Sequence, residues 1–257
     1  MSALGNKSVS PEQLARFGED GYVAFPGFLS ADEVAEVRAN LERFIRETVP
    51  TLPREHAFYE DKSRPETLKQ LQNLHTYDAF FGGLTIGGVF EDVASQLMRE
   101  KAVAQNVQYF NKPAGVGQPT PVHQDGYYFK LEPCVAVTMW LALEKVDAEN
   151  GCVRYLPGSH RRGMRPHGRT TTLGFSQGIS DYGEADERAE VPMPAEPGDL
   201  LVHDALTIHR ADGNHSPTRS RQALGFVYFG ESARIDEEAR TAYQEQLTRE
   251  MKDAGKI

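Results

Sequence analysis

The strongest constraint on the fold is a series of short β-rich runs that begins near residue 102 and is interrupted by glycine and proline. Five such runs can be recognised, at 103–110, 135–143, 153–156, 200–203 and 223–229. Short runs of β-branched, aromatic and apolar residues between turn residues are typical of a β-sandwich or barrel. The run 135–143 is long and apolar enough to form a central strand. We therefore predict a mainly β core over about 102–230.

Helices are expected to precede this core. Ser10 and Pro11 are favourable N-cap and first-turn residues for a short helix over 11–17. Gly21 should end this helix, and the β-forming residues 22–25 should then make a short strand.

A second helix should begin at Ser30, because Ser30 and Glu33 have the spacing of a capping box and an apolar stripe follows them. It should end near Pro50. Residues 90–99 also have a helical pattern, whereas 68–75 fit either a strand or a helical turn.

The whole chain of 257 residues is expected to form one domain. Its parts would be a helical region over 10–100, the β core over about 102–230 and a charged, exposed helix over 235–252. No repeat, low-complexity tract or linker divides them.

Composition restricts the class of protein. A net charge of −9 argues against general nucleic-acid binding, which needs a basic face. No apolar run approaches the ~20 residues needed to cross a bilayer, and residues 1–10 lack the pattern of a signal peptide. We therefore expect no membrane span and a cytoplasmic location. Cys134 and Cys152 lie in ordinary apolar-rich segments and are expected to be free thiols.

The sequence His123-Gln124-Asp125 is a candidate metal site. On a β-strand, residues two positions apart point to the same side, so His123 and Asp125 would face one point in space. Such a pair is two thirds of the two-histidine, one-carboxylate triad that holds non-haem Fe(II). The pattern alone is short and has many chance matches, so it needs a third ligand.

Two downstream histidines are candidates for that ligand. Both follow the turn that precedes strand 200–203, and either His203 or His209 could complete the site. His209 fits better, because it comes at the end of the following segment, whereas His203 sits inside the strand. An arginine in the segment 218–224 would present a planar, permanently charged fork to a carboxylate.

Several ordered motifs resemble the phytanoyl-CoA dioxygenase (PhyH-like) family of Fe(II)/2-oxoglutarate-dependent oxygenases. The N-terminal segments 17–23 and 27–30, the pair His123 and Asp125, and the strand beginning at Trp140 are similar to the family's pattern. The stretch 150–160, with Asn-Gly at its start and Pro-Gly-Ser-His at its end, is the most specific match. Gly198-Asp199, His209 and Arg221 follow in the family's order.

The resemblance implies a double-stranded β-helix, or jelly roll, with flanking helices. It also implies His123, Asp125 and His209 as Fe(II) ligands, with 2-oxoglutarate and O₂ as co-substrates. Arg221 would bind the distal carboxylate of 2-oxoglutarate, with Arg219 as the competitor for that role. Further residues that the resemblance places near the co-substrate are Trp140 and Gln108. One departure is Ala211, where many relatives have a serine that assists the carboxylate.

Asp125 also bears on the reaction, because relatives that halogenate lack this carboxylate. Its presence implies hydroxylation or another oxidation, and we expect hydroxylation of a small organic substrate. The segment 157–191 has little strand pattern and is expected to form a lid or binding loop, the alternative being a disordered surface insertion. The basic residues in and just before this segment suggest an anionic substrate. They are Arg154, Arg161, Arg162, Arg165, His167 and Arg169. The alternatives are a jelly roll that binds metal or ligand without turnover, and a zinc hydrolase.

Overall fold

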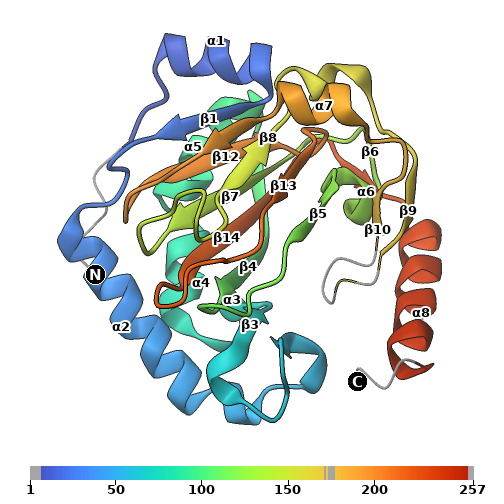
Figure 1. Ribbon diagram of the computed structural model, residues 1–257. Coiled ribbons are helices and arrows are strands. Elements are labelled where there is room, and N and C mark those ends of the chain that lie inside the picture. The colour runs from blue at the N-terminus through green and yellow to red at the C-terminus, as the bar shows by residue number, and fades with distance from the viewer. Residues whose placement is uncertain (1–6, 171, 173–176, 254–257) are drawn as a thin grey trace.

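The computed structural model of the protein describes residues 7–170, 172 and 177–253. Within them, two antiparallel β-sheets form the centre of the molecule (Figure 1). The larger sheet contains β1 (Tyr22–Phe25), β12 (Leu200–Asp204), β7 (Ala136–Ala142), β14 (Arg221–Gly230), β4 (Ala102–Lys112), β3 (Leu68–Leu71) and β2 (Ala57–Tyr59), in this spatial order. The smaller sheet contains β11 (Val191–Met193), β8 (Val153–Tyr155), β13 (His209–Ala211) and β5 (Thr120–His123).

The two sheets pack face to face. Side chains of the larger sheet, among them Trp140, Leu201 and Ala223, share one buried cluster with Val153 and Tyr155 of the smaller sheet. Apart from β2, β3 and β4, which follow one another in the chain, neighbouring strands come from distant parts of the sequence, and several connections cross from one sheet to the other. This arrangement confirms the predicted jelly roll.

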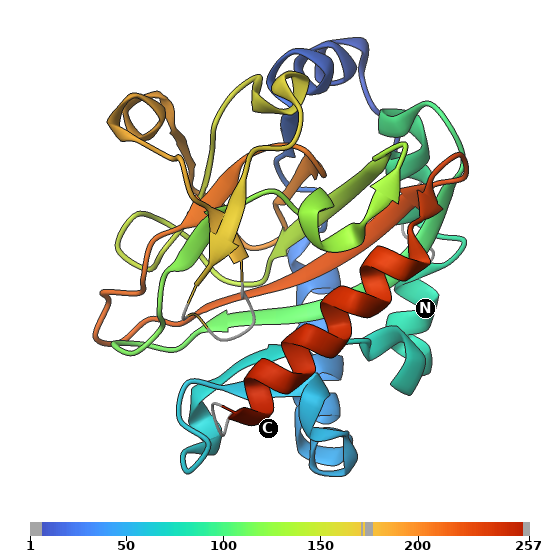
Figure 2. The same cartoon turned by 90° about the vertical axis from the view of Figure 1, so that its right-hand side faces the viewer.

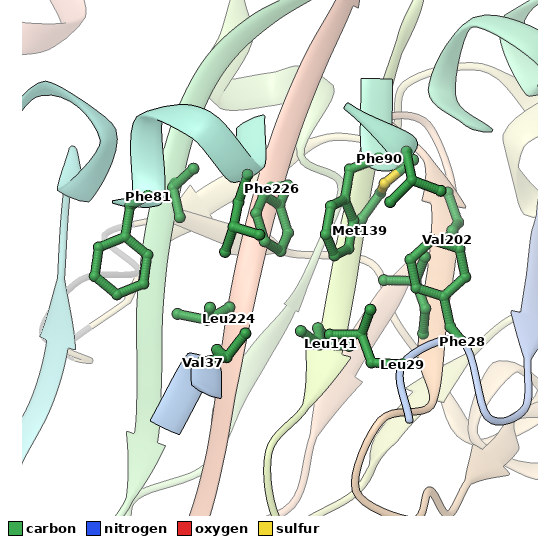
Figure 3. Packing of buried hydrophobic residues seen from close by; sticks show 14 of the residues in the cluster. Phe28, Leu29, Val37, Phe81, Phe90, Met139, Leu141, Val202, Leu224 and Phe226 are labelled. Carbon is green, nitrogen blue, oxygen red and sulfur yellow. The ribbon is translucent and has the colours of Figure 1, made fainter. Parts of the chain in front are cut away.

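Helices cover the outer face of the larger sheet and complete the flanking layer. Figure 3 shows their side chains against β7 and β14. The ring of Phe90 stacks on that of Phe226 with centroids 4.2 Å apart. Burying a side chain of this size stabilises the fold by about 1.5–3 kcal/mol. The helices of this layer are α1 (Pro11–Asp20), α2 (Ala31–Glu47), α3 (Leu74–Tyr77), α4 (Ala79–Thr85) and α5 (Val89–Met98), each of which contributes to the buried cluster. The other described helices, α6 (Gly126–Phe129), α7 (Glu184–Ala189) and α8 (Glu237–Asp253), lie outside that cluster.

The capping residues correctly predicted where the first two helices begin. The Ser10 hydroxyl accepts a hydrogen bond from the backbone N–H of Gln13, and Ser30 and Glu33 form the predicted capping box. Gly21 ends α1 with φ 82°, a left-handed conformation that glycine adopts without a steric penalty. The two possibilities for 68–75 are both realised, since β3 is followed by the short helix α3.

The segment 157–191 differs from the predicted loop with little secondary structure. Besides a 3₁₀ turn (Ser159–Arg162) and α7, it contains the paired strands β9 (His167–Arg169) and β10 (Gln177–Ile179). Residues 171 and 173–176 of this segment lie outside the described part. The hairpin is packed against β5, because a Cβ on Gly178 would lie 3.1 Å from the backbone oxygen of Val122.

The C-terminal helix was predicted over 235–252 and is found as α8. It runs diagonally across the face of the molecule that Figure 2 presents. The remaining two-stranded pair is β6 (Leu131–Glu132) with β15 (Arg234–Ile235), which leads into this helix.

None of the described helices combines the length and apolar character of a membrane span. Cys134 and Cys152 are free thiols, as predicted.

Candidate metal and co-substrate site

The pairing of β5 with β13 brings His123 and His209 together. The two histidines are direct cross-strand partners, and the centroids of their rings lie 4.2 Å apart. This antiparallel pairing joins segments that are far apart in the sequence, at a point where each strand is short. The predicted meeting of these two side chains is therefore present in the structure.

Asp125 joins them by a route that the sequence analysis got wrong. It does not lie on the strand, which ends at His123; it has helical angles (φ −60°, ψ −36°) at the start of α6. The turn into α6 directs the Asp125 carboxylate toward the two histidines; the alternating side-chain directions of a β-strand do not. Its Oδ1 lies 3.3 Å from Nε2 of His123 and 3.8 Å from Nε2 of His209. The three side chains each offer a ligand atom within 4.8 Å of the others.

Backbone carbonyls orient both imidazole rings. Nδ1 of His123 lies 2.7 Å from the oxygen of Pro121, and Nδ1 of His209 lies 3.0 Å from the oxygen of Thr207. Because a carbonyl can only accept, each Nδ1 carries the proton and donates it. Each Nε2 then has its lone pair directed to the shared point, which is the arrangement that metal-binding histidines use.

The second oxygen of Asp125 is fixed by the protein. Its Oδ2 accepts a hydrogen bond from the hydroxyl of Thr138 at 2.5 Å and one from Nε2 of His203 at 3.1 Å. Nδ1 of His203 in turn accepts from the hydroxyl of Tyr155 at 3.0 Å. His203 therefore lies beside the carboxylate, on the oxygen that points away from His123 and His209. Thr138, which the sequence analysis did not single out, is the only hydroxyl-bearing residue in the run 135–143.

Burial and proximity shift the proton affinities within this group. Burial alone would raise the pKa of Asp125, but His209, His123 and His203 together hold it well below its usual range. The pKa of His209 is lowered well below its usual value by burial and by the two other histidines. At neutral pH the group therefore consists of a carboxylate and a neutral His209 imidazole, the protonation states in which these side chains bind metal.

Arg221 lies at the start of β14 and is only 4% exposed. Its guanidinium carbon is 5.3 Å from the centre of the Trp140 ring, and its Nε is buried without a hydrogen-bond partner. Burial lowers the pKa of Arg221 to about 10. A buried cation without a counter-ion is costly, so this position is suited to an anion that arrives from outside.

Arg219, the competing candidate, is engaged elsewhere. Its guanidinium binds both oxygens of Asp147 at 2.9 Å and also contacts Glu149, at the protein surface. Gln108, which lies on β4 opposite Gly225, accepts a hydrogen bond from Gln70 at 2.8 Å.

The basic residues of 154–169 do not all present free charge. The guanidinium of Arg154 binds Asp212 at 2.6 Å. Arg165 binds Asp181 at 3.0 Å and Asp186 at 2.9 Å. Because these carboxylates neutralise them, the expectation that Arg154 and Arg165 meet an anionic substrate is not supported. Arg161 and Arg162 are exposed on the 3₁₀ turn.

Aromatic side chains form the wall next to His123. The Tyr128 ring meets the His123 ring edge-on at 5.8 Å, and the Tyr128 hydroxyl donates to the backbone oxygen of Gln177 at 2.6 Å. Tyr127 stacks on His167 with centroids 4.2 Å apart. Tyr243 of α8 contacts the rings of both tyrosines. The wall thus combines α6, the β9–β10 hairpin and the C-terminal helix.

Comparisons with known structures support the fold. The apo form of EctD from S. alaskensis matches with a TM-score of 0.74 at 21% identity, over 92% of this chain and 84% of that one. The non-heme alpha ketoglutarate dependent carbocyclase SnoK, from nogalamycin biosynthesis, matches with a TM-score of 0.71 at 24% identity, over 90% of this chain and 89% of that one.

Sequence comparisons identify the family. The chain is 28% identical over 262 residues to the peroxisomal phytanoyl-CoA dioxygenase of Mus musculus, covering 96% of this chain and 76% of that protein. It is 29% identical over 264 residues to the phytanoyl-CoA dioxygenase domain-containing protein 1 of Bos taurus, covering 85% and 89% respectively. The family model for phytanoyl-CoA dioxygenase (PhyH) matches residues 17–223. The chain therefore belongs to the phytanoyl-CoA dioxygenase family of Fe(II)/2-oxoglutarate-dependent oxygenases.

Proposed function

We propose that the protein is a dioxygenase that hydroxylates a small organic substrate, with His123, Asp125 and His209 holding Fe(II) and Arg221 binding 2-oxoglutarate. The observation that carries this proposal is the meeting of two Nε2 atoms and one carboxylate oxygen within 4.8 Å. Two similar structures support the proposal: the epimerase SnoN is in complex with Fe3+ and alpha ketoglutarate, and EctD has bound Fe.

The residues present fit these groups. Two imidazoles and one carboxylate are the ligand set of non-haem Fe(II) oxygenases, and they leave coordination positions open. The buried, unpartnered Nε of Arg221 indicates that this guanidinium serves an anion. When bound, the iron would activate O₂, with two electrons supplied by 2-oxoglutarate as it is converted to succinate and CO₂ and two by the substrate that is hydroxylated.

The protein's own residues would orient the bound groups. Thr138 and His203 hold Oδ2 of Asp125, so that Oδ1 faces the histidines and the carboxylate would bind through one oxygen. Arg221 and Trp140 lie together on the inner face of the larger sheet, where they would fix the far end of the co-substrate. Gln108, on the same face, is a further proposed contact.

The substrate would approach the aromatic wall formed by Tyr127, Tyr128, His167 and Tyr243. The hydroxyl of Tyr128 is held by the hairpin, so its ring would limit where a substrate carbon reaches the iron. An anionic group on the substrate stays a prediction, now resting on the exposed Arg161 and Arg162. The cytoplasmic location and the one-domain organisation also stay predictions.

The proposal is tested by adding Fe(II) and 2-oxoglutarate without oxygen. The intact protein should develop a weak visible charge-transfer band, and His123→Ala should not. A panel of small organic acids and neutral compounds is then screened under air for succinate release. A jelly roll that only binds ligand would give no substrate-dependent succinate. A zinc hydrolase would act without 2-oxoglutarate, and either result would contradict the proposal.

A further inference from the structure

A second buried cation lies next to Arg221. Lys112 ends β4 and is the direct cross-strand partner of Arg221 on β14. Directly paired residues of antiparallel strands point to the same face of a sheet, so both side chains enter the space between the two sheets. Both residues are only 4% exposed. Two adjacent basic side chains are thus buried at one end of the jelly roll.

The acidic groups near Lys112 are already occupied. Glu60 binds Lys69 at 3.2 Å. Asp212 binds Arg154 at 2.6 Å, and it also binds Arg210 at 2.5 Å.

Among the described residues, no carboxylate lies within 4 Å of a side-chain nitrogen of Lys112 or Arg221. Burial and the nearby Arg221 lower the pKa of Lys112 well below its usual value. Two buried cations without an anion are a costly arrangement for the fold alone. This charge imbalance indicates a site for a negatively charged group.

The amino group of Lys112 is also placed to organise a hydroxyl. It donates to the backbone oxygen of Gln118 and lies 3.3 Å from Oγ1 of Thr120. Thr120 is the cross-strand partner of Ala211. If Thr120 accepts from the ammonium group of Lys112, its own proton is available to a third group.

This geometry bears on the serine that many relatives have where this chain has Ala211. The hydroxyl of Thr120 lies on the strand next to that position. The hydroxyl of Thr120 on β5 can therefore replace the serine hydroxyl that is missing on β13. Lys112 orients the Thr120 hydroxyl by donating a hydrogen bond to its oxygen.

We propose that Lys112 is a positioning residue for the distal carboxylate of 2-oxoglutarate, acting as a second cation beside Arg221 and through the hydroxyl of Thr120. This inference rests on the proposed function and adds to it a second charge at the carboxylate end. It accounts for the absence of a protein counter-ion for either cation. It also accounts for the loss of the serine at position 211.

The test compares two 2-oxo acids on the full-length protein loaded anaerobically with Fe(II). 2-Oxovalerate ends in a methyl group where 2-oxoglutarate has its distal carboxylate. Replacing Lys112 by methionine should weaken the equilibrium binding of 2-oxoglutarate about 10- to 100-fold, as expected for a charge-assisted contact. The dissociation constant for 2-oxovalerate should change by less than about twofold, since that ligand lacks the group in question.

Lys112→Gln provides a second variant that keeps a hydrogen-bonding side chain without the charge, and it should show the same discrimination. Lys145→Met is the matched control, because Lys145 is exposed and pairs with Glu196 at the surface. It should leave both dissociation constants unchanged.

Two results would overturn the inference. One is an unchanged affinity of both Lys112 variants for 2-oxoglutarate. The other is an equal loss for both ligands, which would show a purely structural role for Lys112. If the unaltered protein bound neither 2-oxo acid, the proposed function itself would fall. Loss of 2-oxoglutarate binding on replacing Arg221 but not Lys112 would refute the present inference alone.

Discussion

Replacing Arg221 by methionine should have opposite effects on stability and on co-substrate binding. The folded protein without ligands carries the cost of burying this guanidinium, and methionine of similar length removes that cost. The same change removes the group that should bind the distal carboxylate of 2-oxoglutarate. A residue with a structural role would lose stability on replacement, so the sign of the change in melting temperature is informative.

The magnitude follows from the proton affinity of the side chain. Burial lowers the pKa of Arg221 from its usual value to about 10. Each tenfold change in an equilibrium constant corresponds to about 1.4 kcal/mol, so burying the charge costs about 3 kcal/mol. The cation–π contact with Trp140, at 5.3 Å, offsets about 1 kcal/mol of this cost. The net gain on replacement is about 2 kcal/mol, equivalent to a rise in melting temperature of about 4–8 °C.

The pH dependence of this effect has a definite sign. The folded-state pKa of Arg221 is depressed, so folding disfavours the charged form. That pKa is still well above 7. The side chain is therefore charged in both folded and unfolded states near neutrality, and the gain should be constant between about pH 6 and pH 8.

The assay has two parts. Thermal unfolding of the metal-free protein gives the stability change, and anaerobic titration of the Fe(II)-loaded protein gives the affinity for 2-oxoglutarate. The affinity should fall at least about 30-fold, as expected when one partner of a buried charge pair is removed. Arg219→Met is the control, because Arg219 binds Asp147 and Glu149 at the surface. It should not raise the melting temperature or weaken the binding. A melting temperature several degrees lower for Arg221→Met, or an unchanged affinity, would refute the reasoning.

Three further predictions concern the metal site, the turn before β12 and the pH dependence of folding. Thr138→Val should weaken Fe(II) binding about 10- to 100-fold, because Oδ2 of Asp125 loses the hydrogen bond from the Thr138 hydroxyl. Competition with a chelator measures the Fe(II) affinity, and an unchanged affinity would contradict the role of this hydroxyl. Gly198→Ala should cost at least about 2 kcal/mol in urea unfolding, because φ is +94° and the new Cβ would lie 2.3 Å from the Leu29 oxygen. Burial lowers the pKa of His75, so the unfolded state binds the proton more readily. The free energy of unfolding should therefore fall as the pH drops below about 6.5, and a His75→Gln variant should show a smaller fall.

Local features of the fold could be predicted from the sequence. The caps of α1 and α2 depend on Ser10 and Ser30 and on residues three positions away, so their signals are contained in a few neighbouring residues. The long strands β4, β7 and β14 were predicted because each contains enough β-forming residues to give a pattern. The strands β5 and β13 were not predicted from their pattern, since Thr120–His123 and His209–Ala211 are too short to show one.

Long-range contacts decided the details of the site. The conformation of Asp125 follows from the turn into α6, and its hydrogen bond from Thr138 comes from a strand of the opposite sheet. The pairing of Arg165 with Asp181 and Asp186 depends on how the segment 157–191 folds back. A sequence pattern shows that a basic residue is present, whereas only the fold shows that its charge is neutralised.

The sequence by itself determined the chemical groups and their order, because the residue types of a metal site must be encoded in the chain. Together with the family resemblance, it gave His123, Asp125, His209 and Arg221 as the candidate set, with His203 and Arg219 as competitors. The tertiary structure decided how these groups are arranged: which oxygen of Asp125 faces the histidines, and which cations have no counter-ion among the residues that the structure describes. These properties depend on distances between segments far apart in the chain, and such distances are set only when the two sheets pack together.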